Sequence, residues 1–129
     1  LTMPENNLGF QSFANELKRI TDKYEQRPKL CNGNVHAAKF QLYRGGETGL
    51  EFYVDTSHCR FTSTPVYLTS LTGNGAHWHV VGISSLYEMT ATGFKIYLGY
   101  MNSTISKQTM LEMSIDNKWT FEWIGIEMK

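Results

Sequence analysis

The hydrophobic pattern of this chain changes its period at Leu30, and this change limits the folds that the chain can adopt. Before Leu30, apolar residues recur at alternating steps of three and four positions, which is the spacing of one face of an α-helix. From Leu30 onward they alternate with polar residues in short runs, which is typical of half-buried β-strands. The sequence therefore predicts a helical segment over residues 1–29 and one all-β domain over residues 30–129.

The predicted helix spans residues 8–25, with Asn7 as its N-cap and Pro28 preventing its continuation. Its apolar stripe covers two heptads, with polar residues between, as in the narrow seam of a coiled coil. The alternative is a helix that packs on its own domain, because two heptads are too short for a stable coiled coil alone. The stripe consists of Phe10, Phe13, Leu17, Ile20 and Tyr24.

The second part contains six predicted strands, separated by turn signals rich in glycine. Short strands at this spacing, with no helical pattern between them, favour an antiparallel sandwich or barrel. The polar stretch 101–118 is expected to be a long loop or an extra edge strand. The predicted strands are 35–43, 49–56, 64–71, 77–87, 93–100 and 119–128.

Charge and hydropathy exclude several classes of partner. Twelve basic residues balance twelve acidic residues, so there is no electrostatic argument for nucleic acid or for an anionic membrane surface. No apolar run approaches the length of a membrane span. The chain begins with Leu1 rather than Met, which indicates a fragment of a longer protein, so the lack of a visible signal peptide carries no conclusion.

Candidate motifs for chemistry are weak. Val54-Asp55-Thr56-Ser57 is similar to the Asp-Thr-Gly loop of aspartic proteases, but it lacks the glycine and a second partner motif. His77 and His79 would lie on one face of a strand, a spacing that metals use, but no third ligand is evident. We therefore expect no enzymatic activity, no metal and no cofactor.

Cys31 and Cys59 are the only cysteines. They are either two buried thiols of a cytosolic protein or one disulfide of a secreted domain, and the second interpretation is favoured. Neither belongs to the Cys-x2-Cys pair of a zinc site. The segment Asn102-Ser103-Thr104 matches the N-glycosylation pattern, which is also common by chance.

The surface composition permits carbohydrate binding without proving it. Tyr, Trp, Asn, Thr and Ser are abundant in the second part of the chain. Aromatic rings suit the apolar C–H faces of sugars, and short polar side chains suit their hydroxyl groups. A protein-binding face has a similar composition, and many of the aromatic residues belong to the core.

Three segments resemble, in this order, the H-type lectin domain family of snail agglutinins and of the discoidin carbohydrate-recognition domain. They are the strand Pro65–Leu71, the segment Thr90–Lys95, which is similar to the family pattern S-P-T-G-F-K, and the closing strand Phe121–Glu127, which is similar to the terminal S-W-I-S-I-E. The resemblance covers Phe61–Met128 and becomes looser back to Val35.

The resemblance implies a six-stranded antiparallel β-sandwich, preceded here by a short helix, that forms a parallel homotrimer. Members of the family bind galactose or N-acetylgalactosamine at subunit boundaries without catalysis. In such a trimer Phe94, Ile96 and Leu98 would face the core. Lys95, Tyr97 and Gly99 would face the other way, toward partner subunits. The helical stripe would then form a three-stranded stem.

The resemblance also implies where a sugar would bind. The family holds it with a Gly-x-Asp loop, an arginine and a Trp-His pair. Here the loop carries its acid at a different spacing, and the arginine and the Trp-His pair are replaced, so the sugar specificity has changed or the face binds protein. A glycan on Asn102 would block this site. The candidate sugar-binding residues are Gly46, Glu47, Ser85, Tyr100, Met101 and Asn102.

The sequence thus predicts a secreted or cell-surface module that binds glycans or mediates adhesion as a homotrimer. The alternative is a trimeric structural module that has lost sugar binding and contacts a cell-surface protein. By analogy with secreted lectins, Cys31 and Cys59 are expected to form a disulfide. Trp123 is expected to be a core anchor and not a platform for sugar.

Overall fold

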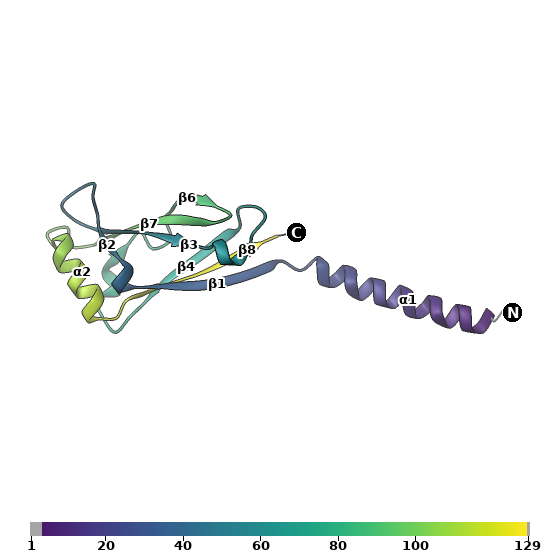
Figure 1. Ribbon diagram of the computed structural model, residues 1–129. Coiled ribbons are helices and arrows are strands. Elements are labelled where there is room, and N and C mark those ends of the chain that lie inside the picture. Colours follow the sequence, from purple (N-terminus) through teal and green to yellow (C-terminus); the bar gives the residue numbers. More distant parts are fainter. Residues whose placement is uncertain (1–3, 129) are drawn as a thin grey trace.

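The computed structural model describes residues 4–128, and the side chains of residues 9–128. The chain forms an N-terminal helix followed by a mostly β domain (Figure 1). The helices and strands are α1 (Pro4–Glu25), β1 (Lys29–His36), β2 (Gln41–Leu42), β3 (Leu50–Asp55), β4 (Val66–Thr72), β5 (Val80–Val81), β6 (Leu86–Thr90), β7 (Gly93–Tyr100), α2 (Lys107–Asp116) and β8 (Thr120–Glu127). Three single-turn 3-10 helices are η1 (Ala37–Lys39), η2 (Ser57–Cys59) and η3 (His77–His79).

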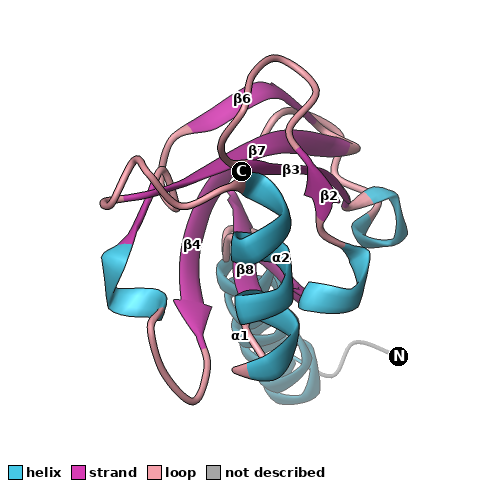
Figure 2. Ribbon diagram, turned by 90° about the vertical axis from the view of Figure 1, so that its left-hand side faces the viewer, coloured by secondary structure: helices cyan, strands magenta, loops and turns pink. Residues whose placement is uncertain are grey.

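The strands form two antiparallel sheets that pack face to face (Figure 2). One sheet has three strands in the order β1-β8-β4. The other has the order β2-β3-β7-β5, and β6 pairs with β7 beside β5. The predicted antiparallel sandwich is therefore confirmed, although its strands number eight in the described residues rather than six.

The core lies between the two sheets and is built from alternate residues of each strand. On β7, Phe94, Ile96 and Leu98 are fully buried, as the sequence predicted, and Phe121 of β8 meets Phe94 from the other sheet with ring centroids 6.2 Å apart. Trp123 of β8 belongs to the same buried cluster. This alternation follows from the two-residue period of a strand, which sends successive side chains to opposite faces. The outward face of the five-stranded sheet is consequently built from the intervening residues.

Two predicted strands differ from the observed elements. Residues 35–43 contain the end of β1, then η1 and the two-residue β2, because β1 begins six positions earlier and pairs with β8 along its whole length. Residues 77–87 contain η3, β5, a loop at Gly82 and the start of β6. Gly82 has a positive φ of 93°, which favours glycine and interrupts the edge strand.

The stretch 101–118, predicted to be a loop or an edge strand, contains the helix α2 instead. Ser106 is its N-cap, since its hydroxyl oxygen accepts a hydrogen bond from the amide of Thr109. Helix α2 buries Met110 and Ser114 and covers the end of the sandwich opposite to α1 (Figure 1). Its apolar residues are too few and too irregularly spaced to give a clear helical period.

Helix α1 extends away from the sandwich and ends at Glu25, as predicted (Figure 1). It begins earlier than expected, at Pro4, so Asn7 lies inside the helix and is not its N-cap. Proline is well suited to a first helical turn because its missing amide would have no partner there. All five residues of the predicted stripe are exposed, between 51% and 72% of each residue's surface, so the helix does not fold back on its own domain.

A disulfide joins Cys31 and Cys59, whose Cα atoms are 5.8 Å apart, as the sequence predicted. Cys31 lies on β1 of the three-stranded sheet, and Cys59 lies in η2, directly after β3 of the other sheet. The bond therefore connects the two layers near the end from which α1 extends.

Candidate functional site

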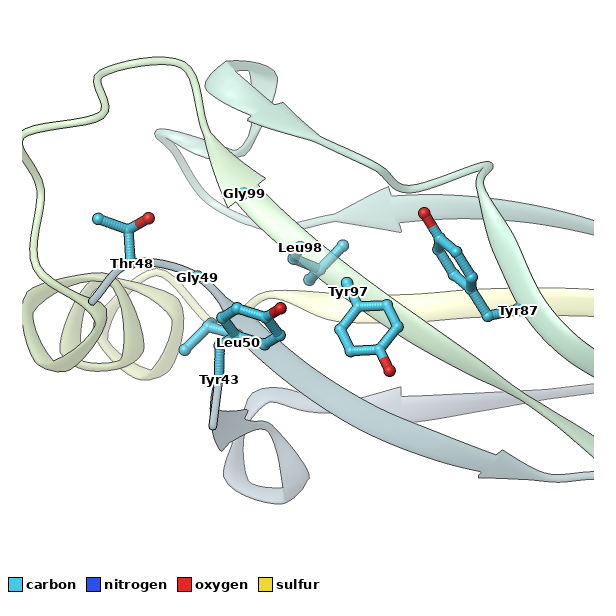
Figure 3. A pocket seen from close by; sticks show the side chains of 8 residues that line it. All are labelled: Tyr43, Thr48, Gly49, Leu50, Tyr87, Tyr97, Leu98 and Gly99. Carbon is cyan, nitrogen blue, oxygen red and sulfur yellow. The ribbon is translucent and has the colours of Figure 1, made fainter. Parts of the chain in front are cut away.

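A groove with a volume of about 490 Å³ lies on the outward face of the five-stranded sheet, and three tyrosines form its walls (Figure 3). Tyr97 is central. The ring of Tyr43 meets it edge-on with centroids 5.6 Å apart, and the ring of Tyr87 does so at 5.0 Å. Thr48, Gly49, Leu50, Leu98 and Gly99 complete the lining.

The fold brings these tyrosines together from three separate segments. Tyr97 belongs to the outward row of β7, Tyr87 lies on the neighbouring edge strand β6, and Tyr43 follows β2 on the other side. The amide of Tyr43 donates to the carbonyl of Gly49 (3.1 Å), which closes the loop between β2 and β3. Gly49 has a φ of 98°, and a Cβ there would lie 3.1 Å from the carbonyl oxygen of Leu98, so the floor of the groove requires glycine.

A buried carboxylate lies beside Tyr97 on the same face. Glu51 is directly opposite Tyr97 in the β3–β7 pairing and is only 3% exposed. The Arg44 side chain donates to it from Nε at 2.7 Å, and Lys95 Nζ lies 3.5 Å from its other oxygen. The hydrogen bond from Arg44 is the main reason that the pKa of Glu51 lies below its usual value, so the carboxylate stays ionised at neutral pH.

Lys95 connects this carboxylate to the aromatic wall. Its Nζ lies 5.2 Å from the centroid of the Tyr97 ring. Hydrogen bonding to the Tyr97 side chain, with smaller contributions from the charges nearby, raises the pKa of Lys95. The groove thus offers aromatic faces and phenol hydroxyls, and a fixed ion pair lies beside its lining. Such a surface can pack against apolar C–H groups and exchange hydrogen bonds with hydroxyls.

The residues predicted to bind sugar do not line this groove. Gly46 and Glu47 lie in the loop before β3. The carbonyl of Gly46 accepts from Nζ of Lys107, and the carbonyl of Glu47 accepts from the amide of Lys107. Ser85 lies in the loop between β5 and β6, where its amide donates to Gly82.

The other three predicted residues lie together at the end of β7. Tyr100 pairs with Val80 and is half-buried, whereas Met101 and Asn102 are exposed in the turn that follows. The antiparallel register, in which Leu98 pairs with Leu50, brings this end of β7 to the same edge of the sheet as the loop with Gly46 and Glu47. Ser85 lies away from this end, beside the middle of β7, since the next residue, Leu86, pairs with Ile96.

Sequence reasoning missed two of the three tyrosines of the groove. It placed Tyr97 on the outward face, which the structure confirms, but it assigned that face to partner subunits and did not single out Tyr43 or Tyr87. Tyr43 follows Leu42 of β2, and Tyr87 follows Leu86 of β6. Successive residues of a strand point to opposite faces, so an inward leucine predicts an outward tyrosine after it. This signal could have identified them.

A second aromatic cluster lies at the edge of the sandwich. The predicted strand geometry for His77 and His79 is wrong, because both belong to the 3-10 helix η3 and do not share a strand face. The ring of Trp78 lies 3.8 Å from that of His79, and His79 lies 5.4 Å from Tyr100. Trp78 is 76% exposed, so most of its ring surface is open to solvent.

One group of potential metal ligands is present in the described residues. The ligand atoms of Cys31, His58 and Cys59 lie within 4.8 Å of one another. The two sulfur atoms are bonded to each other, so they are not thiolates and do not bind a metal in this state. His58 Nε2 lies 3.6 Å from the sulfur of Cys59.

Comparison with known proteins gives limited matches. No protein-family model and no curated protein sequence matches the chain. Among the helices of residues 4–128, none is both long and apolar enough to cross a membrane. Among solved structures, the chain is similar to recombinant discoidin II of Dictyostelium discoideum, with 17% identity and a TM-score of 0.47. The match covers 79% of this chain and 38% of the discoidin II chain, so this chain spans well under half the length of that protein.

Proposed function

We propose that this chain is an extracellular, non-catalytic module that binds glycans and is multimerised through its N-terminal helix. The observation that carries the proposal is the tyrosine groove on the outward face of the five-stranded sheet. Residues 30–129 would form the binding domain and residues 1–29 its stem. The order of the three segments that resemble H-type lectin domains supports an assignment to that family.

The chemistry of the groove favours a sugar over a wholly apolar ligand. The rings of Tyr43, Tyr87 and Tyr97 offer surfaces for the C–H face of a pyranose, as aromatic side chains do in sugar sites. Their hydroxyls can exchange hydrogen bonds with sugar hydroxyls, and Arg44, whose side chain is 79% exposed, can donate further hydrogen bonds from beside the groove. A shallow site of this kind binds one sugar weakly. Several copies on one stem raise the apparent affinity through effective concentration.

The exposed stripe of α1 supports self-association. Five apolar side chains exposed on one helix face leave a large apolar surface in water, and such surfaces mark interaction sites. We propose a parallel homotrimer, because aromatic residues at core positions need more room than a two-stranded coiled coil provides. The stem is short, so contacts between the sandwiches would have to contribute as well.

The Cys31–Cys59 disulfide supports an extracellular location. Disulfides form and persist in secreted and cell-surface proteins and are rare in the reducing cytosol. The expected ligands are glycans of the galactose or N-acetylgalactosamine type, by resemblance to the family, although the residues that hold these sugars in the family are replaced here.

The same helix supports a second candidate function. The stem could serve only to cluster a longer protein, with the sandwich contacting a cell-surface protein and no sugar. The replaced Trp-His pair at Met101 and Asn102 favours this alternative.

A glycan array separates the two functions. We expect the wild-type chain to bind a restricted set of glycans and Tyr87→Ala to bind them about fivefold more weakly, since one aromatic contact contributes about 1 kcal/mol. Tyr53→Ala is the matched control, because Tyr53 lies outside the groove on the same face and is 56% exposed, compared with 51% for Tyr87. Absence of binding to any glycan, or equal losses in both variants, would leave only the clustering function.

Sedimentation equilibrium tests the stem. The wild-type chain should have a mass three times that of one 14.8 kDa chain. Leu17→Asp together with Ile20→Asp should lower the association constant, because charges are costly to bury at a coiled-coil seam. These side chains are exposed in the single chain, so the sandwich should keep its fold. The control variant, Gln11→Asp with Asn15→Asp, adds the same charge on the polar face of the helix and should leave the mass of the assembly unchanged. A monomeric wild-type protein would exclude the trimer.

A further inference from the structure

The segment Asn102-Ser103-Thr104 forms a hydrogen-bonded turn at the surface. The Asn102 carbonyl accepts from the amide of Ile105, and the Asn102 side-chain oxygen accepts from both the amide and the hydroxyl of Thr104, the latter at 2.6 Å. All three residues of the motif are exposed. The side-chain oxygen is thus held by Thr104, whereas no hydrogen bond within the described residues engages the side-chain nitrogen, Nδ2.

Trp78 offers a large exposed aromatic surface next to His79, the residue whose carbonyl is hydrogen-bonded to Met101 just before this turn. One face lies against His79, and the residue is 76% exposed. The backbone of η3 follows Ala76, which has a left-handed conformation (φ 65°), and the amide of His79 donates to the carbonyl of Ala76. The exposed face of the indole is apolar surface that a packed group would remove from water.

The backbone brings the segments that carry these two features together. The amide of Met101 donates to the carbonyl of His79 (2.9 Å), and the next pair, Tyr100 and Val80, belongs to the β5–β7 ladder. Asn102 follows Met101 and Trp78 precedes His79, so their Cα atoms are at most about 13 Å apart. A sugar attached to Asn102 can span the space between the two side chains.

We propose that Asn102 is N-glycosylated and that the first N-acetylglucosamine of the glycan packs its apolar face on the indole of Trp78. The donor class is an oligosaccharide linked to a lipid pyrophosphate. Nδ2 of Asn102 forms a bond to C1 of the sugar and loses one proton, while the bond from C1 to the pyrophosphate oxygen breaks and the lipid pyrophosphate leaves. This inference rests on the extracellular role proposed above, since only a secreted chain meets this donor.

The packing follows from the chemistry of both partners. A pyranose offers a row of C–H groups to the face of an aromatic ring, and such contacts bury apolar surface that Trp78 otherwise exposes. Asn102 lies beyond the end of β7, whereas Tyr97, at the centre of the tyrosine groove, lies inside this strand. We expect the first sugar of the glycan to cover the predicted residues Met101 and Asn102 and to leave the rings of the three groove tyrosines accessible.

The test expresses the full chain behind a secretory leader in animal cells. Intact mass and peptide mapping report whether Asn102 carries a glycan. Enzymatic removal of the glycan with an amidase converts Asn102 to aspartate, so Asn102→Asp, expressed in the same cells, is the control for that charge. Acrylamide quenching of tryptophan fluorescence then reports on Trp78, because the other two tryptophans, Trp119 and Trp123, are buried.

We expect Asn102 to be occupied, and we expect the glycan to lower the quenching slope at least about twofold relative to the deglycosylated protein and to Asn102→Asp. Trp78→Ala should keep the glycan but show no change in quenching on its removal. An unmodified Asn102 in secreted, disulfide-bonded protein would overturn the site. Full occupancy with unchanged quenching would overturn the packing. Glycan-array binding by Asn102→Asp tests the groove separately, so failure of the proposed function is distinguishable from failure of this inference.

Discussion

Replacing Trp123 by alanine should remove one of the largest side chains of the hydrophobic core. Trp123 points inward from β8, the central strand of the three-stranded sheet, and is 4% exposed. It packs edge-on against Tyr67 (6.2 Å between centroids) and His58 (5.8 Å). Directly opposite lies Gly33, where an added Cβ would come within 2.6 Å of the indole, so the ring occupies space that β1 leaves open.

The expected loss of stability can be worked out from this burial. An aromatic side chain of this size buries about 200 Å², which at about 25 cal/mol per Å² corresponds to an upper bound of about 5 kcal/mol. Measured losses for such truncations are about 3–5 kcal/mol, because neighbouring side chains fill part of the cavity. A domain of this size has a total stability of about 5–15 kcal/mol, so Trp123→Ala should bring it close to unfolding.

Urea denaturation followed by far-UV circular dichroism measures this loss at a fixed protein concentration, because association adds to the apparent stability. With a slope of about 1–3 kcal/mol per molar urea, the midpoint should fall by about 2 M. Trp78→Ala is the matched control: the same residue type is deleted from an exposed position, and the loss should stay within about 0.5 kcal/mol. A loss of less than about 1 kcal/mol for Trp123→Ala would refute the assignment of this residue as a core anchor.

Three further predictions concern stability. Replacing Cys31 and Cys59 by serine should lower the free energy of unfolding by about 3–4 kcal/mol, the chain-entropy value for a loop with a separation of 28 residues, as measured by urea denaturation; an unchanged midpoint would contradict it. The folded pKa of Glu51 lies below 4.5, so its contribution is present above that pH and is lost as the pH falls through the folded pKa. The melting temperature should therefore decrease in acid, and Arg44→Ala should weaken this dependence. Glu127→Ala should lower the melting temperature more than Glu127→Gln, since one carboxylate oxygen accepts four hydrogen bonds that glutamine can retain in part.

The period of the hydrophobic pattern could be read from the sequence wherever an element is long and has one buried face. Strand β7 has the predicted bounds, and its alternation identified Phe94, Ile96 and Leu98 as core residues. The C-terminus of α1 at Glu25 and the exposed stripe of the helix were also visible from spacing and from Pro28. In these cases the local period is informative, because one whole face of the element has a single environment: it is buried in the core for β7 and exposed for the stripe of α1.

Elements whose stability depends on a partner could not be predicted in the same way. Strand β1 contains Asn32, Gly33 and Asn34, which have low strand propensity, and it exists because β8 pairs with it over eight residues. Helix α2 has a weak apolar period, and its position is fixed by burial of Met110 and Ser114 against the end of the sandwich. For short or polar segments, tertiary contacts outweigh local preference.

The candidate site illustrates the same division. The sequence by itself determined the change of period along the chain, the core face of its longest strands, the cysteine pair and the outward direction of Tyr97 on its strand. Only the tertiary structure decided which side chains meet Tyr97, because Tyr43 and Tyr87 come from edge strands on opposite sides of the sheet. The approach of the segment with Trp78 to the segment with Asn102 likewise depends on a backbone hydrogen bond between residues more than twenty positions apart, from Met101 to His79. Hydrophobic period is a local property of a strand, whereas the register between strands, which assembles a binding surface, is fixed only when the sheets pack.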